Sequence, residues 1–151
     1  MRHHERGGSL VEFALVASTL MLLITGVIYL GMLVYSYTAV ANAARLAARW
    51  ASVRGASCVA GASNGCPATQ SNIQSYVVSQ LPGVVTSPPP TVSPTWTTPP
   101  WSSSGPSGCS SAAETAGCLV QVRITYSFPL TIPFYGPVPA FSATSQAIVA
   151  R

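Results

Sequence analysis

Residues 7–54, GGSLVEFALVASTLMLLITGVIYLGMLVYSYTAVANAARLAARWASVR, decide the fold of this 151-residue chain. No charged residue lies between Glu12 and Arg45, and the 22 positions from Ala14 to Tyr35 are largely apolar. A helix of that length rises about 33 Å, which is enough to cross the hydrocarbon core of a bilayer. The stretch therefore predicts one transmembrane helix, around which the rest of the chain is organised.

The segment before this helix, residues 1–7, is short, polar and net basic. The apolar run is longer than the hydrophobic region of a secretory signal peptide, so we expect the helix to be retained. Arginines flank the span on both sides. The charge difference that normally sets the orientation of a membrane helix is therefore weak. Orientation is therefore inferred from the cysteines.

All four cysteines, Cys58, Cys66, Cys109 and Cys118, follow the span. An even number confined to one side predicts two disulfides in an oxidising compartment, and hence an extracytoplasmic C-terminal part. Three pairings are open. The local one, Cys58–Cys66 with Cys109–Cys118, closes two short loops, each stabilising by roughly 2.5 kcal/mol on the chain-entropy model. A zinc site is the alternative, but the spacings lack the close ligand pairs of structural zinc sites, so no metal is expected.

Composition argues against nucleic-acid binding and catalysis. Charged residues make up 7% of the chain, and seven Arg are spread thinly against three Glu, so no basic stripe for nucleic acid is present. Residues 61–65, GASNG, match the G-x-S-x-G pattern of a nucleophile elbow, but they lack the strand that must precede it. The two histidines, His3 and His4, lie on the other side of the span. We expect neither enzymatic activity nor a cofactor.

The helix is expected to continue beyond the membrane as an amphipathic segment. A ladder of small side chains four residues apart permits close approach by a helix of another subunit, although packing against the chain's own head is an alternative. The ladder is Ala39, Ala43, Ala47 and Ala51; the predicted apolar face is Ala39, Ala43, Leu46, Trp50 and Val53, and the polar face is Asn42, Arg45, Arg49 and Ser52.

The sequence after the long helix predicts a small α+β head. Residues 68–81 have the spacing of a short helix, and alternation predicts strands over 119–128 and 141–149, with a long connection between them. Residues 82–106 hold eight prolines among many Ser and Thr, which favours an extended segment outside the packed core. A strand near 84–86 or 91–93 stays an open alternative.

Three motifs together resemble the TadE-like pseudopilins of the tight-adherence (Flp) pilus system. They are RGGSLVEFALV at 6–16, NAARLAARWA at 42–51, and the ending with VRITYSFPL at 122–130 and SATS at 142–145. The chain departs from the family at Leu46 and Ala47, where the family often has Glu-Gly, which leaves the role of these two positions open.

The resemblance implies cleavage by a prepilin peptidase after a glycine, with glutamate fifth in the mature protein. The cut then falls between Gly7 and Gly8, in a signature completed by Glu12 and Phe13. Removing residues 1–7 leaves a positive amine on Gly8, and the amine of a neighbouring subunit could neutralise Glu12 during lateral assembly. The resemblance also implies that Asn42, Arg45 and Arg49 form the family's post-membrane motif.

The sequence therefore predicts a leader (1–7), a long membrane helix (8–54) and an extracytoplasmic head (55–151) that contains the Pro/Ser/Thr-rich insert 82–106. The expected protein is a single-pass inner-membrane minor pilin with a cytoplasmic amino terminus, acting in Flp pilus assembly. Its expected partners are the lipid bilayer, other pilin subunits, pilus assembly proteins and the prepilin peptidase. A type II secretion pseudopilin and an envelope protein that binds a ligand through Trp96 and Trp101 are the alternatives.

Overall fold

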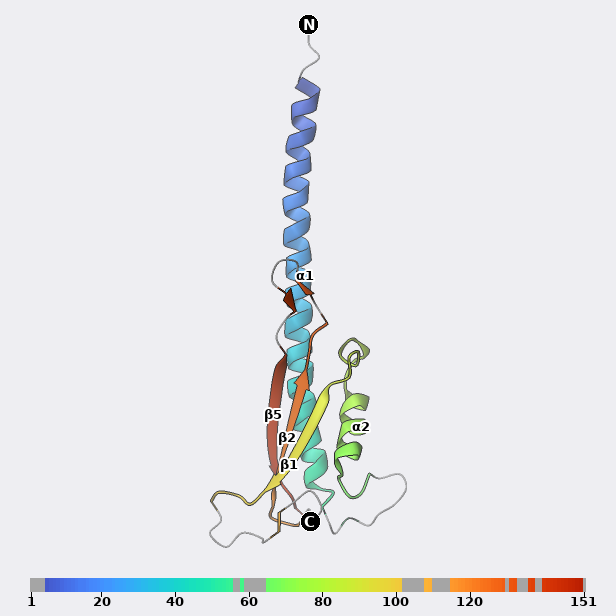
Figure 1. Cartoon of the computed structure of the whole chain (residues 1–151), viewed down its shortest axis with the longest axis vertical. Coiled ribbons are helices and arrows are strands. Elements are labelled where there is room, and N and C mark those ends of the chain that lie inside the picture. The colour runs from blue at the N-terminus through green and yellow to red at the C-terminus, as the bar shows by residue number, and fades with distance from the viewer. Residues whose placement is uncertain are drawn as a thin grey trace. The chain divides into compact units, whose positions relative to one another are not determined.

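The chain forms a long apolar helix and a small α+β head, which confirms the predicted fold class (Figure 1). It divides into two compact units, Met1–Tyr35 and Ser36–Arg151. The computed structural model describes residues 5–55, 58, 65–101, 108–109, 115–129, 131–132, 136–137 and 140–150.

Helix α1 spans Glu5–Ser52. It contains no proline, and it ends where the amide of Arg54 donates to the carbonyl of Ala51, 3.1 Å away. The second compact unit begins at Ser36, so the head starts within α1 and not at residue 55. The last part of α1 is therefore a core element of the head.

Helix α2, Gln70–Gln80, confirms the short helix predicted over 68–81. Thr69 caps its first turn, since the Thr69 hydroxyl accepts a hydrogen bond from the amide of Asn72 at 3.3 Å. The helix buries Ile73 and Val77, and it stops before Pro82, which disfavours helical backbone in the residue before it.

Three antiparallel strands form the sheet in the order β1-β2-β5: β1 is Thr91–Thr97, β2 is Leu119–Tyr126 and β5 is Phe141–Ile148. Strands β2 and β5 were predicted, and the inward side chains of β2 at 120, 122, 124 and 126 are buried, as the alternation requires. A small hairpin of β3 (Thr131–Ile132) and β4 (Gly136–Pro137) interrupts the predicted connection. A 3-10 helix, η1, covers Gly83–Val85.

Strand β1 corrects the prediction for the proline-rich segment. Val92 and Trp96 are buried, so this part of residues 82–106 belongs to the core. The strand left open near 91–93 is confirmed and extends past Pro94 to Thr97, whereas residues 83–85 form η1 instead of a strand. Pro94 is tolerated because β1 is an edge strand.

The core lies between the C-terminal part of α1, helix α2 and the inner face of the sheet. The predicted apolar face of α1 is confirmed at Ala39, Ala43 and Trp50, which are buried in the core or pack against it. It is wrong at Leu46 and Val53, whose side chains are 43% and 59% exposed, and the predicted polar face is wrong at Ser52, which is buried. Small residues fill the face that meets the sheet, whereas larger apolar residues lie beside it or outside it. The buried side chains of α1 are Val40, Ala43, Ala44, Ala47, Ala48 and Ala51.

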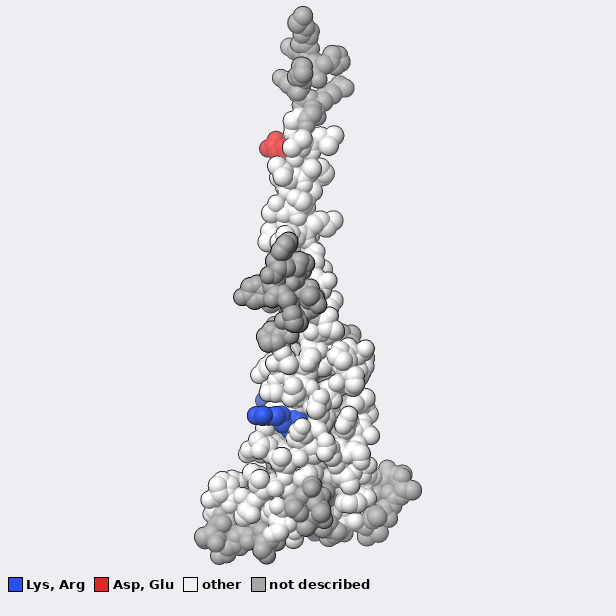
Figure 2. All heavy atoms as spheres, in the orientation of Figure 1, with Lys and Arg blue, Asp and Glu red and all other residues white. Residues whose placement is uncertain are grey.

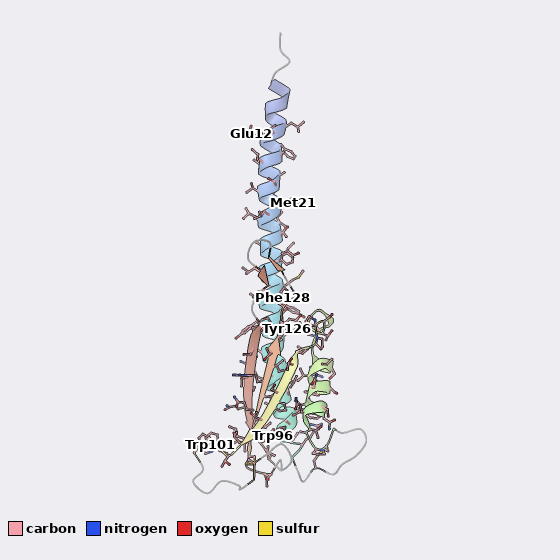
Figure 3. All side chains as sticks on the ribbon, in the orientation of Figure 1. Glu12, Met21, Trp96, Trp101, Tyr126 and Phe128 are labelled. Carbon is pink, nitrogen blue, oxygen red and sulfur yellow. A yellow bond between two sulfur atoms is a disulfide. The ribbon has the colours of Figure 1, made fainter. Side chains whose placement is uncertain are left out.

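Aromatic rings close one end of this core. The ring of Phe141 lies edge-on to the rings of Tyr37 and Tyr126, with centroid distances of 5.8 and 5.5 Å. Tyr126 also meets Phe128 edge-on, and burial raises the pKa of the Tyr126 hydroxyl (Figure 3).

At the other end of the head, Trp50 contacts both Tyr76 and Arg54. Its indole stacks on Tyr76 of α2 at 5.0 Å, and the guanidinium of Arg54 lies 4.2 Å from the ring centroid. Gly65 has a φ of +66°, and a Cβ added there would come within 2.6 Å of the indole. Only glycine satisfies both the backbone conformation and the space at this position.

Substituting Gly65→Ala should therefore destabilise the head by at least about 1–2 kcal/mol, because the left-handed conformation alone costs that much for a residue with a Cβ. Gly83→Ala is the matched control, since a Cβ at Gly83 meets nothing within 4 Å. Denaturant unfolding of the detergent-solubilised full chain, followed by tryptophan fluorescence, measures both. Equal stabilities of the two variants would contradict the packing of Gly65 on Trp50.

Candidate functional site

The candidate site is the N-terminal part of α1, whose apolar side chains are uncovered. Gly8–Ser52 is long and apolar enough to cross a membrane, and it is the one such helix in the part of the chain that the structure describes. Phe13, Leu22 and Val27 are 72–73% exposed. Such a surface requires an apolar environment, which a bilayer or packed helices of other subunits can supply.

The hydroxyl groups within this segment are compatible with lipid. Ser18 and Thr19 each donate to the carbonyl of Leu15 at 2.9 Å, and Thr25 donates to the carbonyl of Met21 at 2.8 Å. Each hydroxyl is therefore satisfied within its own helix, so it adds little to the cost of burial in hydrocarbon.

Glu12 is the exception in this segment. Figure 2 shows a single acidic side chain on an otherwise uncharged surface, and Figure 3 locates Glu12 on α1. Among the described residues, Glu12 has no ion-pair partner. A carboxylate on an apolar helix costs a few kcal/mol when it is drawn into lipid unpaired, so this position favours pairing with a cation.

The predicted processing site lies in the first turns of α1. The helix begins at Glu5, so the Gly7–Gly8 bond is within it, and a Cβ at Gly8 would meet nothing within 4 Å. Gly8 and Glu12 are four residues apart and therefore share one helix face. Most of the predicted leader, residues 1–4, lies outside the described residues.

The alanine ladder lies largely inside the head. Ala43, Ala47 and Ala51 are 3%, 0% and 1% exposed, and Ala39 is partly buried. The chain's own core therefore encloses the first three, in agreement with the alternative that they pack against their own head. Their small size allows α1 to approach the sheet closely.

The post-membrane motif divides between the core and the surface. Its alanines point inward, whereas Asn42, Arg45 and Arg49 are exposed. Neither arginine has an ion-pair partner among the described residues. The motif therefore presents two cations, one turn apart, on the outside of α1.

Both disulfides are local. Cys58 is bonded to Cys66 and Cys109 to Cys118, which is one of the three pairings that the sequence left open. The first closes the connection from α1 to α2, and the second ties the loop before β2 to the buried start of that strand. Most of the GASNG segment, residues 61–64, lies outside the described residues.

The two tryptophans of the proline-rich segment have different surroundings. Trp96 is 7% exposed and belongs to the core, whereas Trp101 is 65% exposed (Figure 3). Trp96 therefore anchors β1 to the head. This leaves Trp101 as the accessible one of the pair.

Sequence reasoning missed the cluster of Trp50, Arg54 and Tyr76. The spacing of four residues between Trp50 and Arg54 was a usable indication, because the helix was predicted to extend to residue 54 and would place both side chains on one face. In the structure α1 ends at Ser52, and Arg54 lies just beyond its end. The stacking partner, Tyr76, lies on another helix, and its position follows from the tertiary fold alone.

Enlarging a ladder residue tests its place in the core. Ala47→Leu should lower the stability of the head by about 1–3 kcal/mol, because overpacking forces neighbouring side chains out of their preferred rotamers. Leu46→Ala, at an exposed position of the same turn, should change it by less than about 0.5 kcal/mol. Thermal unfolding of the solubilised full chain measures both, and a stable Ala47→Leu variant would contradict this placement.

Comparison with known proteins supports the interpretation of α1. No curated protein and no solved structure matches the chain. Residues 7–49 match the family model described as TadE-like protein. The matched segment includes the predicted processing site, the apolar span and the post-membrane motif. Residues 7–49 are therefore a TadE-like sequence, and the resemblance predicted from the motifs is confirmed.

Proposed function

We propose that this protein is a membrane-anchored minor pilin or pseudopilin that takes part in assembling a Flp-type adhesion pilus. The observation that carries the proposal is the coincidence of two features in α1. The first part of the segment that matches the TadE-like family, residues 8–35, is also the part of α1 whose apolar side chains are uncovered. The match associates the chain with a pilus system, and the uncovered surface supplies the means of anchoring and lateral packing.

In this proposal a prepilin peptidase cuts the Gly7–Gly8 bond on the cytoplasmic side of the inner membrane. The product carries a positive amine on Gly8, and Glu12 lies about 6 Å further along the helix axis. Amine and carboxylate then occupy neighbouring depths in the membrane. When two helices pack side by side, the amine of one subunit neutralises Glu12 of the next and offsets its desolvation.

The head lies outside the cytoplasm, where an oxidising environment maintains the two disulfides. We assign lateral packing to the uncovered part of α1, residues 8–35, and to Ala39, which is only partly buried. The exposed motif residues Asn42, Arg45 and Arg49 face other pilin subunits or assembly proteins. The protein acts by positioning its partners, and no catalytic step is assigned to it.

Processing gives the first test. Mass spectrometry of the protein from cells that contain the prepilin peptidase should show a chain that starts at Gly8. The chain from cells without the peptidase should retain Met1 or Arg2. A chain with the same N-terminus in both strains would overturn the processing step, and a cut after Gly8 would overturn its register.

The role of Glu12 gives the second test. Glu12→Ala should leave membrane insertion unchanged but reduce assembled pili about ten- to a hundredfold, the equivalent of losing one charge-assisted contact of about 1.5–3 kcal/mol. Val16→Ala, one turn away on the same exposed surface, is the matched control. Membrane fractionation and quantitative imaging of pili give the two readouts. Normal piliation in Glu12→Ala cells would refute the pairing.

A further inference from the structure

The hydroxyl side chains of the head differ in what they contact. On α2, the exposed side chains of Ser75 and Ser79 donate to the carbonyls of Ser71 and Tyr76, at 3.0 and 2.7 Å. A hydroxyl bonded in this way is held against the backbone of its own helix. The hydroxyls of strand β1 have different surroundings.

Strand β1 carries a hydroxyl group on every second residue. Its sequence is TVSPTWT, and the side chains of Val92 and Trp96 are buried in the core. Because side chains alternate along a strand, the odd-numbered residues point the other way, and they are exposed on the outer face of the sheet. We call these four residues the hydroxyl row: Thr91, Ser93, Thr95 and Thr97.

The hydroxyl row makes almost no hydrogen bonds within the chain. Thr95 donates to the carbonyl of Gln121 over 3.5 Å, a distance too long to hold the group firmly. In the part of the chain that the structure describes, the hydroxyls of the other three members have no hydrogen-bond partner. Their oxygen atoms are therefore accessible to solvent and to an enzyme.

The sequence around the hydroxyl row has the composition of a segment that carries sugars. Residues 82–106 combine eight prolines with many Ser and Thr, which is typical of O-glycosylated segments. Pro94 lies between Ser93 and Thr95. A proline favours an extended backbone in the residue before it, and an extended backbone is the conformation that exposes Ser93 here.

The surface of this part of the head also lacks the charges that hydrate most protein surfaces. No charged residue occurs between Arg54 and Glu114. A soluble surface commonly contains roughly 25–35% charged residues. Sugars are rich in hydroxyl groups, so sugars attached to the hydroxyl row would supply hydration that the side chains of this segment do not.

The geometry of the hydroxyl row suits several sugars at once. Successive members are two residues apart, which separates them by about 6.7 Å along the strand. A sugar ring is narrower than this, so neighbouring members can be modified together. On β2, the residues paired with Thr91, Ser93 and Thr95 all have polar side chains that can hydrogen-bond to a sugar. They are Thr125, Arg123 and Gln121.

We propose that the hydroxyl row is a site of O-linked glycosylation, at which a glycosyltransferase attaches sugars taken from a sugar phosphate ester. The hydroxyl oxygen forms a bond to the anomeric carbon, and the bond between that carbon and the phosphate oxygen breaks. The phosphate leaves with the bonding electrons, and the hydroxyl proton passes to a basic group of the transferase. The proposal concerns the head alone and does not depend on the proposed pilin function.

Two other modifications fit the chain less well. N-linked glycosylation requires Ser or Thr two positions after an asparagine, and none of Asn42, Asn64 and Asn72, the three asparagines, meets this requirement. Phosphorylation would add a charge of about −1.5 to −2 at each member of the hydroxyl row, and phosphates about 6.7 Å apart repel one another. Uncharged sugars avoid this repulsion.

Mass spectrometry of the full-length protein, purified from membranes of its native host, tests the proposal. Trypsin cuts after Arg54 and Arg123, so it releases the hydroxyl row and the α2 serines in one peptide, residues 55–123. Electron-transfer fragmentation, which leaves sugars attached, should locate mass increments of whole sugar units on the hydroxyl row. Ser75 and Ser79 are the matched controls and should be unmodified, because their hydroxyls are bonded to the helix backbone.

Four results would each overturn the proposal. They are an unmodified peptide, equal modification of the α2 serines, sugars confined to residues outside the hydroxyl row, and phosphate increments on the row. The same chain made in a host without O-glycosyltransferases gives the reference mass, which should equal that of the bare sequence.

A fourfold variant tests whether the hydroxyl row carries the sugars of the whole protein. Threonine is replaced by valine, which keeps the β-branched shape that strands favour, and serine by alanine. The intact mass of this variant from the native host should fall to that of its bare sequence. The changes are Thr91→Val, Ser93→Ala, Thr95→Val and Thr97→Val.

The matched control replaces the three threonines of the hydroxyl row by serine. This variant keeps every hydroxyl group, so it should keep the sugar mass of the native protein. A fourfold variant that retains the full sugar mass, or a serine variant that loses it, would contradict the requirement for these hydroxyl groups.

Discussion

The close contact between the alanine-lined face of α1 and the apolar face of the sheet is the constraint on which the head depends. Ala43, Ala47 and Ala51 are almost fully buried there, so the helix backbone can lie near the strands. Loops that leave this layer are fastened by two disulfides and by the ring of Trp50.

One helix therefore meets two different requirements. Before Tyr35 the helix exposes many large apolar side chains, among them Phe13, Leu22 and Val27, as a lipid or helix environment demands. After Ser36 one face becomes small and buried, and the opposite face carries Arg45 and Arg49. The TadE-like match, residues 7–49, includes residues of both regions.

Much of the fold was predictable because the sequence patterns that indicate it are formed by residues close together in the chain. The apolar span, the α2 spacing and the alternation of β2 and β5 each depend on residues close in sequence. Strand β1 was harder to predict from the sequence, because Pro94 interrupts its alternation. That proline is acceptable only because β1 is an edge strand.

The face of α1 that meets the sheet was mispredicted for a different reason. Leu46 and Val53 were assigned to the buried face because they are hydrophobic, whereas the buried positions are occupied mainly by alanine, whose small side chain fits against the core. At the candidate site, the sequence located Glu12 and the glycines of the predicted processing site. Which hydroxyls of residues 82–106 are exposed and unbonded depends on the packing of β1 in the head, which no local pattern encodes.

The common direction of α1 and β5 has a mechanical consequence. Phe141 lies beside Tyr37 at one end, and Ala150 is bonded to Ser52 at the other. A pull applied along this part of α1 is therefore directed along β5 and not across it.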